Sequence, residues 1–255
     1  DHNDQAIRIV HHLEKKYFDF DGLNLTWETL EGLVKHNGPL INEIPSTISE
    51  LDKKFNLSLG EYSSLEAQVA AISDDIAYNN HDIDDGLRAG FFNYNELKEL
   101  PLIGEVISTL PKKFEERDIQ RINNEITRRS TNLMINDILD TMQNNIEIFK
   151  INELESVRNL NKPVVHFSNE MQSKVDSVRL FLSNKMYNHD SVNKMTDNAK
   201  KVISFLYVFL LDADDSVYDD LKINLNQKED KSRIICDFIS GMTDNFAQSI
   251  YEKYS

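Results

Sequence analysis

The amino-acid sequence predicts an all-α fold, and three observations indicate it. Apolar residues recur at intervals of three and four along nearly every long segment, which is the helical pattern. The 255 residues include only 8 glycines and 5 prolines, far below the average usage of about 12% for the two together. Helix-capping and helix-stopping residues also stand at the ends of these apolar patterns. Such a chain is expected to have many helices and few strands.

Helices follow one another through the first part of the chain. Thr26 can cap the second helix, and Asn37-Gly38-Pro39 ends it. Ser63 and Glu66 form a Ser-x-x-Glu capping box at the start of a long helix that Gly90 closes. The expected ranges are 4–17, 26–37, 46–55, 63–88, 95–100, 103–113 and 115–149.

The second part of the chain has the same helical spacing of apolar residues, which predicts three further helices. Asn161-Lys162-Pro163 breaks the chain, and Val164 to Phe167 predicts a brief extended piece. Residues 212–220 form an acidic linker and residues 224–228 a loop, while Gly241 is a candidate point of close packing inside the last helix. The expected helices cover 169–186, 191–213 and 231–251. No domain boundary is evident, so a single all-α unit over 1–255 is expected.

Charge and cysteine content exclude several classes of protein. The net charge of −15 predicts repulsion from nucleic acid and from anionic membranes. No run of 18 apolar residues predicts a membrane span, and no secretory signal is present at the start. The single Cys236 excludes an internal disulfide and a cysteine metal cluster. These features predict a cytoplasmic protein.

The long helix expected over 63–88 carries chemistry on one face. At about 100° per residue, five polar side chains fall within about 100° of one another: Asp74, Tyr78, His81, Asp82 and Asp85. An apolar spine lies on the opposite side of the helix: Leu65, Ile72, Ile76 and Ile83.

Two interpretations of this face stay open. Spacing alone favours an ordinary amphipathic helix with a solvated face. Alanines at 67, 70, 71 and 77 border the face, however, and suggest close packing there. Stacked carboxylates also repel one another and need a counterion, and a divalent cation bound by oxygen and imidazole ligands would meet that need.

The same residues carry a family resemblance. The stretch Asp74-Asp75-Ile76-Ala77-Tyr78-Asn79-Asn80-His81-Asp82 resembles the signature of bacterial dGTPase-like HD-domain hydrolases, which are deoxynucleoside-triphosphate triphosphohydrolases. Other segments scattered across the chain also resemble family motifs: His2-Asn3-x-Gln5, Gly22-Leu23-Asn24-Leu25-Thr26, Lys35-His36-Asn37 and Gly241-Met242-Thr243-Asp244.

The resemblance implies roles for particular residues. It makes Asp74 a ligand of a divalent metal, Mg²⁺ or Mn²⁺, and it places Tyr78 and Asp82 against the deoxyribose, where they help to exclude a 2′-hydroxyl. It implies a catalytic His2 near the triphosphate. Substrate binding is expected of Gln5, Lys35, Arg128 and Arg129, although each arginine could equally make a structural ion pair. His36 could contact phosphate or could simply favour the end of its helix.

The resemblance also implies the fold, the reaction and the partners. Residues 1–113 would be the remainder of an HD-type catalytic core, with 114–255 a C-terminal helical region packed on it. The reaction would be hydrolysis of a dNTP to a deoxynucleoside and intact triphosphate by a homo-oligomer. No His-Asp pair precedes His2, where the other metal ligands of the family belong, so we expect an N-terminal HD segment to be missing from this chain. The alternative is a nucleotide-binding or oligomeric partner that lacks the metal site.

Overall fold

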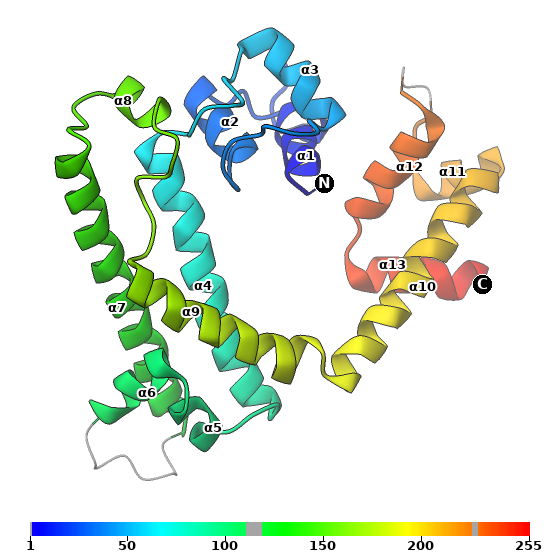
Figure 1. Cartoon of the computed structure of the whole chain (residues 1–255). Coiled ribbons are helices and arrows are strands. Elements are labelled where there is room, and N and C mark those ends of the chain that lie inside the picture. The colour runs from blue at the N-terminus through cyan, green and yellow to red at the C-terminus, as the bar shows by residue number, and fades with distance from the viewer. Residues whose placement is uncertain (1, 111–118, 226–228) are drawn as a thin grey trace. The chain divides into compact units, whose positions relative to one another are not determined.

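The all-α prediction is confirmed by the computed structural model, which describes residues 2–110, 119–225 and 229–255. Every regular element in these ranges is a helix (Figure 1). None of these helices is long and apolar enough to cross a bilayer. The described chain is thus built by packing amphipathic helices on one another.

The chain divides into two compact units, residues 1–182 and 183–255. The first unit contains α1 (His2–Arg8), the π-helix η1 (Ile9–Leu13), α2 (Trp27–Val34), α3 (Ser46–Phe55), α4 (Leu65–Ala89), α5 (Tyr94–Lys98), α6 (Pro101–Ser108), α7 (Ile119–Ile148), α8 (Leu154–Arg158) and α9 (Asn169–Leu182). The second contains the π-helix η3 (Ser183–Tyr187), α10 (Asp190–Asp212), α11 (Asp215–Leu221), α12 (Lys231–Ser240) and α13 (Asp244–Tyr254).

The boundary between the units differs from the sequence-based division at 113/114. Both α7 and α9 pack against α4 and α6, so the chain up to Leu182 belongs to the first unit. In the second unit, α10 packs against α12 and α13 around the buried side chains of Val202, Leu206 and Ile250. Amphipathic periodicity does not reveal such a boundary, because each helix has one apolar stripe whichever neighbour covers it.

One hydrophobic cluster of the first unit lies among α1, α2, α3 and the segment that follows α3. Its buried members are all aliphatic: Ile7, Leu30, Val34, Ile48, Leu51, Leu57 and Leu59. A buried carboxylate reinforces the contact of α1 with α3, since Asp4 accepts hydrogen bonds from the Thr47 hydroxyl (2.9 Å) and from the Ile48 backbone N–H (3.1 Å). This arrangement leaves α1, α2 and α3 as one packed group at the start of the chain.

The helix α4 runs over 25 residues and packs along α7 (Figure 1). Ile76 and Ile83 of the predicted apolar spine are buried, 4% and 2% exposed. The predicted capping box is wrong: Ser64 is the N-cap, and its Oγ accepts from the Ala67 N–H, so Glu66 stands one position too early to complete the box. The predicted end is confirmed, because Gly90 follows the helix with a φ of +73°.

Several other predicted boundaries are wrong, and local capping explains two of them. The acidic linker expected over 212–220 contains α11, because the Asp214 side chain accepts from the Val217 N–H at the start of that helix. The single helix expected over 231–251 is two helices. Gly241 ends α12 instead of packing inside a helix, and Thr243 caps α13.

Three further segments depart from the prediction. The first helix ends at Leu13 with a turn of π-helix. The piece expected to be extended at 164–167 has no regular structure, and the helix α8 comes between α7 and this piece, where no helix was expected. Three predicted pieces lie outside the described residues: the end of one helix at 111–113, the start of the next helix at 115–118, and most of the 224–228 loop.

Candidate functional site

Asp74, Tyr78 and Asp82 lie one turn apart along one side of α4, as the sequence predicts. The side chain of Asp74 is about half exposed, Tyr78 is 63% exposed, and Asp82 is partly buried. Two of the bordering alanines, Ala70 and Ala77, are exposed, so the close packing expected beside them is not seen in the described part of the chain. The face is therefore open to a ligand.

The end of α2 meets α4 beside Asp74. His36 follows α2 directly, and its Nε2 lies 3.6 Å from Asp74 Oδ2. The two helices come close because residue 32 is glycine: a Cβ there would lie 3.1 Å from the Cβ of Ala67. A cavity of about 420 Å³ lies at this junction, and its lining includes His36, Tyr62, Gln68 and Asp75. The packing of α2 on α4 thus brings an imidazole to the predicted metal ligand.

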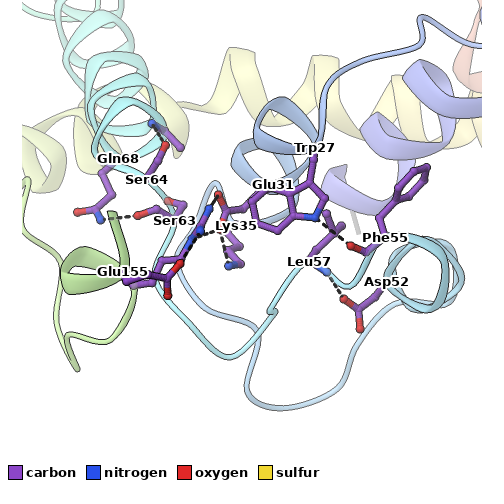
Figure 2. A network of polar contacts seen from close by, with 12 residues as sticks. Trp27, Glu31, Lys35, Asp52, Phe55, Leu57, Ser63, Ser64, Gln68 and Glu155 are labelled. Atoms are coloured by element: carbon purple, nitrogen blue, oxygen red, sulfur yellow. Dashed lines mark hydrogen bonds and ion pairs between the residues drawn. The ribbon is translucent and has the colours of Figure 1, made fainter. Parts of the chain in front are cut away.

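Lys35 takes part in an ion cluster in which its own side chain and that of Glu31 are fully buried. Its Nζ donates to Glu31 Oε1 at 2.9 Å, and neither side chain is exposed (Figure 2). Arg158 of α8 donates to both oxygens of the same carboxylate, from Nε at 3.3 Å and from a terminal nitrogen at 3.1 Å. A phosphate would have to compete with Glu31 for the Lys35 ammonium, so the predicted phosphate contact of this side chain needs a local rearrangement.

The predicted paired arginines on α7 also bind a carboxylate. Arg128 and Arg129 both donate to Glu125 Oε2 at 2.8 Å, and Arg129 donates in addition to the Thr109 hydroxyl at 3.1 Å. Their hydrogen bonds lower the pKa of Glu125 to about 2. Of the two alternatives open from the sequence, the structure contains the ion pair, and both guanidinium groups are still partly exposed.

His2 and Gln5 lie on α1, which packs against α2. His2 is exposed and Gln5 is partly buried. The structure therefore groups the predicted residues by helix: His2 and Gln5 on α1, Lys35 at the end of α2, the Asp74 series on α4 and the arginines on α7. Within the described part of the chain, the predicted metal ligand Asp74 is approached by His36, which follows the C-cap of α2.

The donor set does not fit a complete Mg²⁺ or Mn²⁺ site. Among residues 2–110, 119–225 and 229–255, no three His, Cys, Asp or Glu side chains are grouped so that they could hold a metal ion. Asp74 and His36 provide two donors, whereas hard divalent cations take about six oxygen or nitrogen ligands. The described residues therefore supply two possible donors at this position, which are too few for a complete metal site.

Sequence reasoning missed the residues that join this site to the rest of the unit. Glu31 and Arg158 form the buried cluster with Lys35, and the buried Gln68 accepts from the backbone N–H groups of Val164 and Val165 at 2.9 and 3.1 Å. The only local signal was the spacing of four between Glu31 and Lys35, which favours an ion pair on any helix. Arg158 has no such signal, since it lies 127 residues from Glu31.

Known proteins resemble the chain over nearly its whole length. Residues 165–253 match a family model described as a phosphohydrolase-associated domain. Proteins named deoxyguanosinetriphosphate triphosphohydrolase-like protein from Caulobacter sp. and Parvibaculum lavamentivorans are each 40% identical, over 99% and 97% of this chain. One of the same name from Ruegeria sp. is 38% identical over 99%. The chain spans 66%, 64% and 67% of these three relatives, about two thirds of their length.

Proposed function

The chain belongs to the family of deoxyguanosinetriphosphate triphosphohydrolase-like proteins, and from this membership we propose that it hydrolyses deoxynucleoside triphosphates. Water would attack the α-phosphorus, and the bond from that phosphorus to O5′ would break. The deoxynucleoside would leave with the proton, and triphosphate would be released intact. The observation that carries the proposal is the open face of α4, on which Asp74, Tyr78 and Asp82 stand one turn apart beside His36.

The roles of the residues on this face follow from their chemistry. Tyr78 and Asp82 offer a phenol and a carboxylate that suit the sugar hydroxyl, and a close fit there would reject a ribonucleotide. His2 would stabilise the charge that develops on the triphosphate, and Gln5 and Lys35 would bind the triphosphate. Arg128 and Arg129 both donate hydrogen bonds to Glu125. They would bind the substrate only if they contacted it and Glu125 at the same time.

A requirement for Mg²⁺ or Mn²⁺ is part of the proposal, with Asp74 as the ligand from this chain. A divalent metal lowers the pKa of bound water and polarises the phosphoryl group. The described residues provide too few donors to complete a metal site around Asp74.

The test is incubation of the full-length gene product with each of the four dNTPs and Mn²⁺, followed by separation of the products. We expect inorganic triphosphate and the deoxynucleoside in equal amounts from at least one dNTP. Asp74→Asn is the matched inactive variant, because it removes the predicted ligand from an exposed position without opening the core. Absence of triphosphate from every dNTP would exclude the proposal.

One observation favours a second candidate function. The incomplete donor set also suits a nucleotide-binding or oligomeric partner that performs no hydrolysis. Such a protein would bind a dNTP, measured by isothermal titration calorimetry, and would give no triphosphate under any metal. Light scattering decides in the same preparation whether the protein is a homo-oligomer, as we propose for the hydrolase.

A further inference from the structure

We propose that Arg158 is a positioning residue for this site: through Glu31 it holds the end of α2, from which Lys35 and His36 come. The inference rests on the proposed function, because it assigns a role within the same site. Arg158 stands on α8, outside every segment that resembles a substrate-binding motif of the family.

The geometry of the cluster requires an arginine. One buried carboxylate, Glu31, accepts from two cations at once, and Arg158 reaches both of its oxygens while Lys35 keeps one. A planar guanidinium fork can bridge two oxygens, whereas a lysine ammonium is a single point of charge. Trp27 of α2 fixes the guanidinium from a further side, with its ring 4.8 Å away. Arg158 is thus held in one place, 11% exposed, against α2.

The cluster is connected directly to the site. Lys35 is the residue that ends α2, and its backbone N–H bonds to the Glu31 carbonyl at 2.9 Å. His36 comes next in the chain and lies 3.6 Å from Asp74. The ion pair to Arg158 therefore fixes the last turn of α2, and that turn fixes where His36 stands relative to Asp74.

The same segment of chain also holds α4. Val164 and Val165, six and seven residues after Arg158, donate from their backbone to Gln68 Oε1 in the first turn of α4. Gln68 Nε2 in turn donates to the Ser63 carbonyl at 2.9 Å (Figure 2). The segment from α8 to Val165 therefore contacts both α2, through Arg158 and Glu31, and α4, through Gln68. By these contacts it fixes how the two helices are placed relative to each other.

The experiment compares Arg158→Met with Arg158→Lys in the full-length protein. Arg158→Met leaves the Glu31–Lys35 pair in place and releases the end of α2. We expect the KM for the dNTP to rise about tenfold while kcat stays within about twofold, because contacts that hold the substrate equally in ground and transition state act on KM. Arg158→Lys keeps the positive charge but loses the two-pronged guanidinium group. Its KM should therefore lie between that of wild type and that of Arg158→Met.

Glu155→Gln is the matched control. Glu155 contacts Arg158 from the other side at 3.2 Å, and its side chain is 65% exposed, so its loss should leave the KM unchanged. A purely structural Arg158 would lower the melting temperature and leave the KM of the folded enzyme unchanged, and that result would overturn the proposal. If Arg158→Met does not fold, the KM of Arg158→Lys decides alone.

Binding of inorganic tripolyphosphate separates this proposal from the proposed function. The probe needs no hydrolysis, and calorimetry gives its Kd for wild type and for Arg158→Met. A Kd about tenfold weaker in the variant supports the positioning role even if no dNTP is hydrolysed, in which case the proposed function alone fails. An equal Kd in both proteins, or no binding to wild type, would overturn the role of Arg158.

Discussion

Two ion clusters of the first unit each combine one glutamate with two cationic side chains, but one cluster is largely buried and the other is partly exposed. In each, one glutamate binds two cations, and one of the cations stands four residues later on the same helix: Glu31 with Lys35, and Glu125 with Arg129. The Glu31 cluster is buried, with both α2 side chains at zero exposure, whereas the Glu125 cluster is partly exposed throughout. The third member differs as well, because Arg128 is a neighbour on α7 while Arg158 comes from α8.

This difference in burial decides which of the two ion clusters constrains the tertiary structure. Water screens the Glu125 cluster, so its charges are weakly coupled and each member can be lost at little cost. The members of the Glu31 cluster have lost their hydration, and each needs the others to compensate for it. The buried cluster therefore constrains which distant segments meet, and the exposed cluster follows from spacing on one helix.

The largest expected effect is that of Glu31→Gln. The change leaves Lys35 and Arg158 with no buried carboxylate, and breaking a buried ion pair in this way costs about 4 kcal/mol of unfolding free energy. Urea denaturation followed by circular dichroism measures it. A loss below about 1 kcal/mol would show that water reaches the cluster, and the contrast with Glu125 would disappear.

A smaller effect is expected when the whole buried cluster is made apolar. Glu31→Met, Lys35→Met and Arg158→Leu together remove all the buried charge and keep similar volume, so the protein should recover to within about 2 kcal/mol of wild type. The same urea titration applies. If the triple variant is as unstable as Glu31→Gln, the cluster stabilises the fold by its contacts with α8 and not through compensation of charge.

The smallest effect belongs to Glu125→Gln. Its folded pKa of about 2 lies below the ordinary value of 4.5, so the carboxylate stabilises the fold above pH 4.5 and loses this effect as the pH falls toward 2. The melting temperature of wild type should therefore fall more steeply than that of the variant between pH 5 and pH 2. At pH 7 wild type should melt at a slightly higher temperature than the variant, and this difference should close toward pH 2. Parallel acid profiles would contradict the assigned pairing.

Local features of the fold were predictable from particular residues. The range 46–55 was predicted correctly from apolar spacing, and Gly90 marked the end of α4. The α4 face was predictable for the same reason, because helical periodicity alone puts Asp74, Tyr78 and Asp82 on one side. The failures at 212–220 and at Gly241 are also local: Asp214 and Thr243 were not recognised as caps that start new helices.

The sequence by itself determined the all-α class, most of the longer helices, the polar face of α4 and, by its resemblance to a family, the chemistry expected there. Only the tertiary structure decided that Lys35 is buried, that His36 meets Asp74, and that Arg158 joins Glu31 across 127 residues. The physical reason is the distance along the chain over which each interaction acts. Capping and amphipathic spacing act within a few residues, whereas the burial of a charge depends on which distant segment covers it.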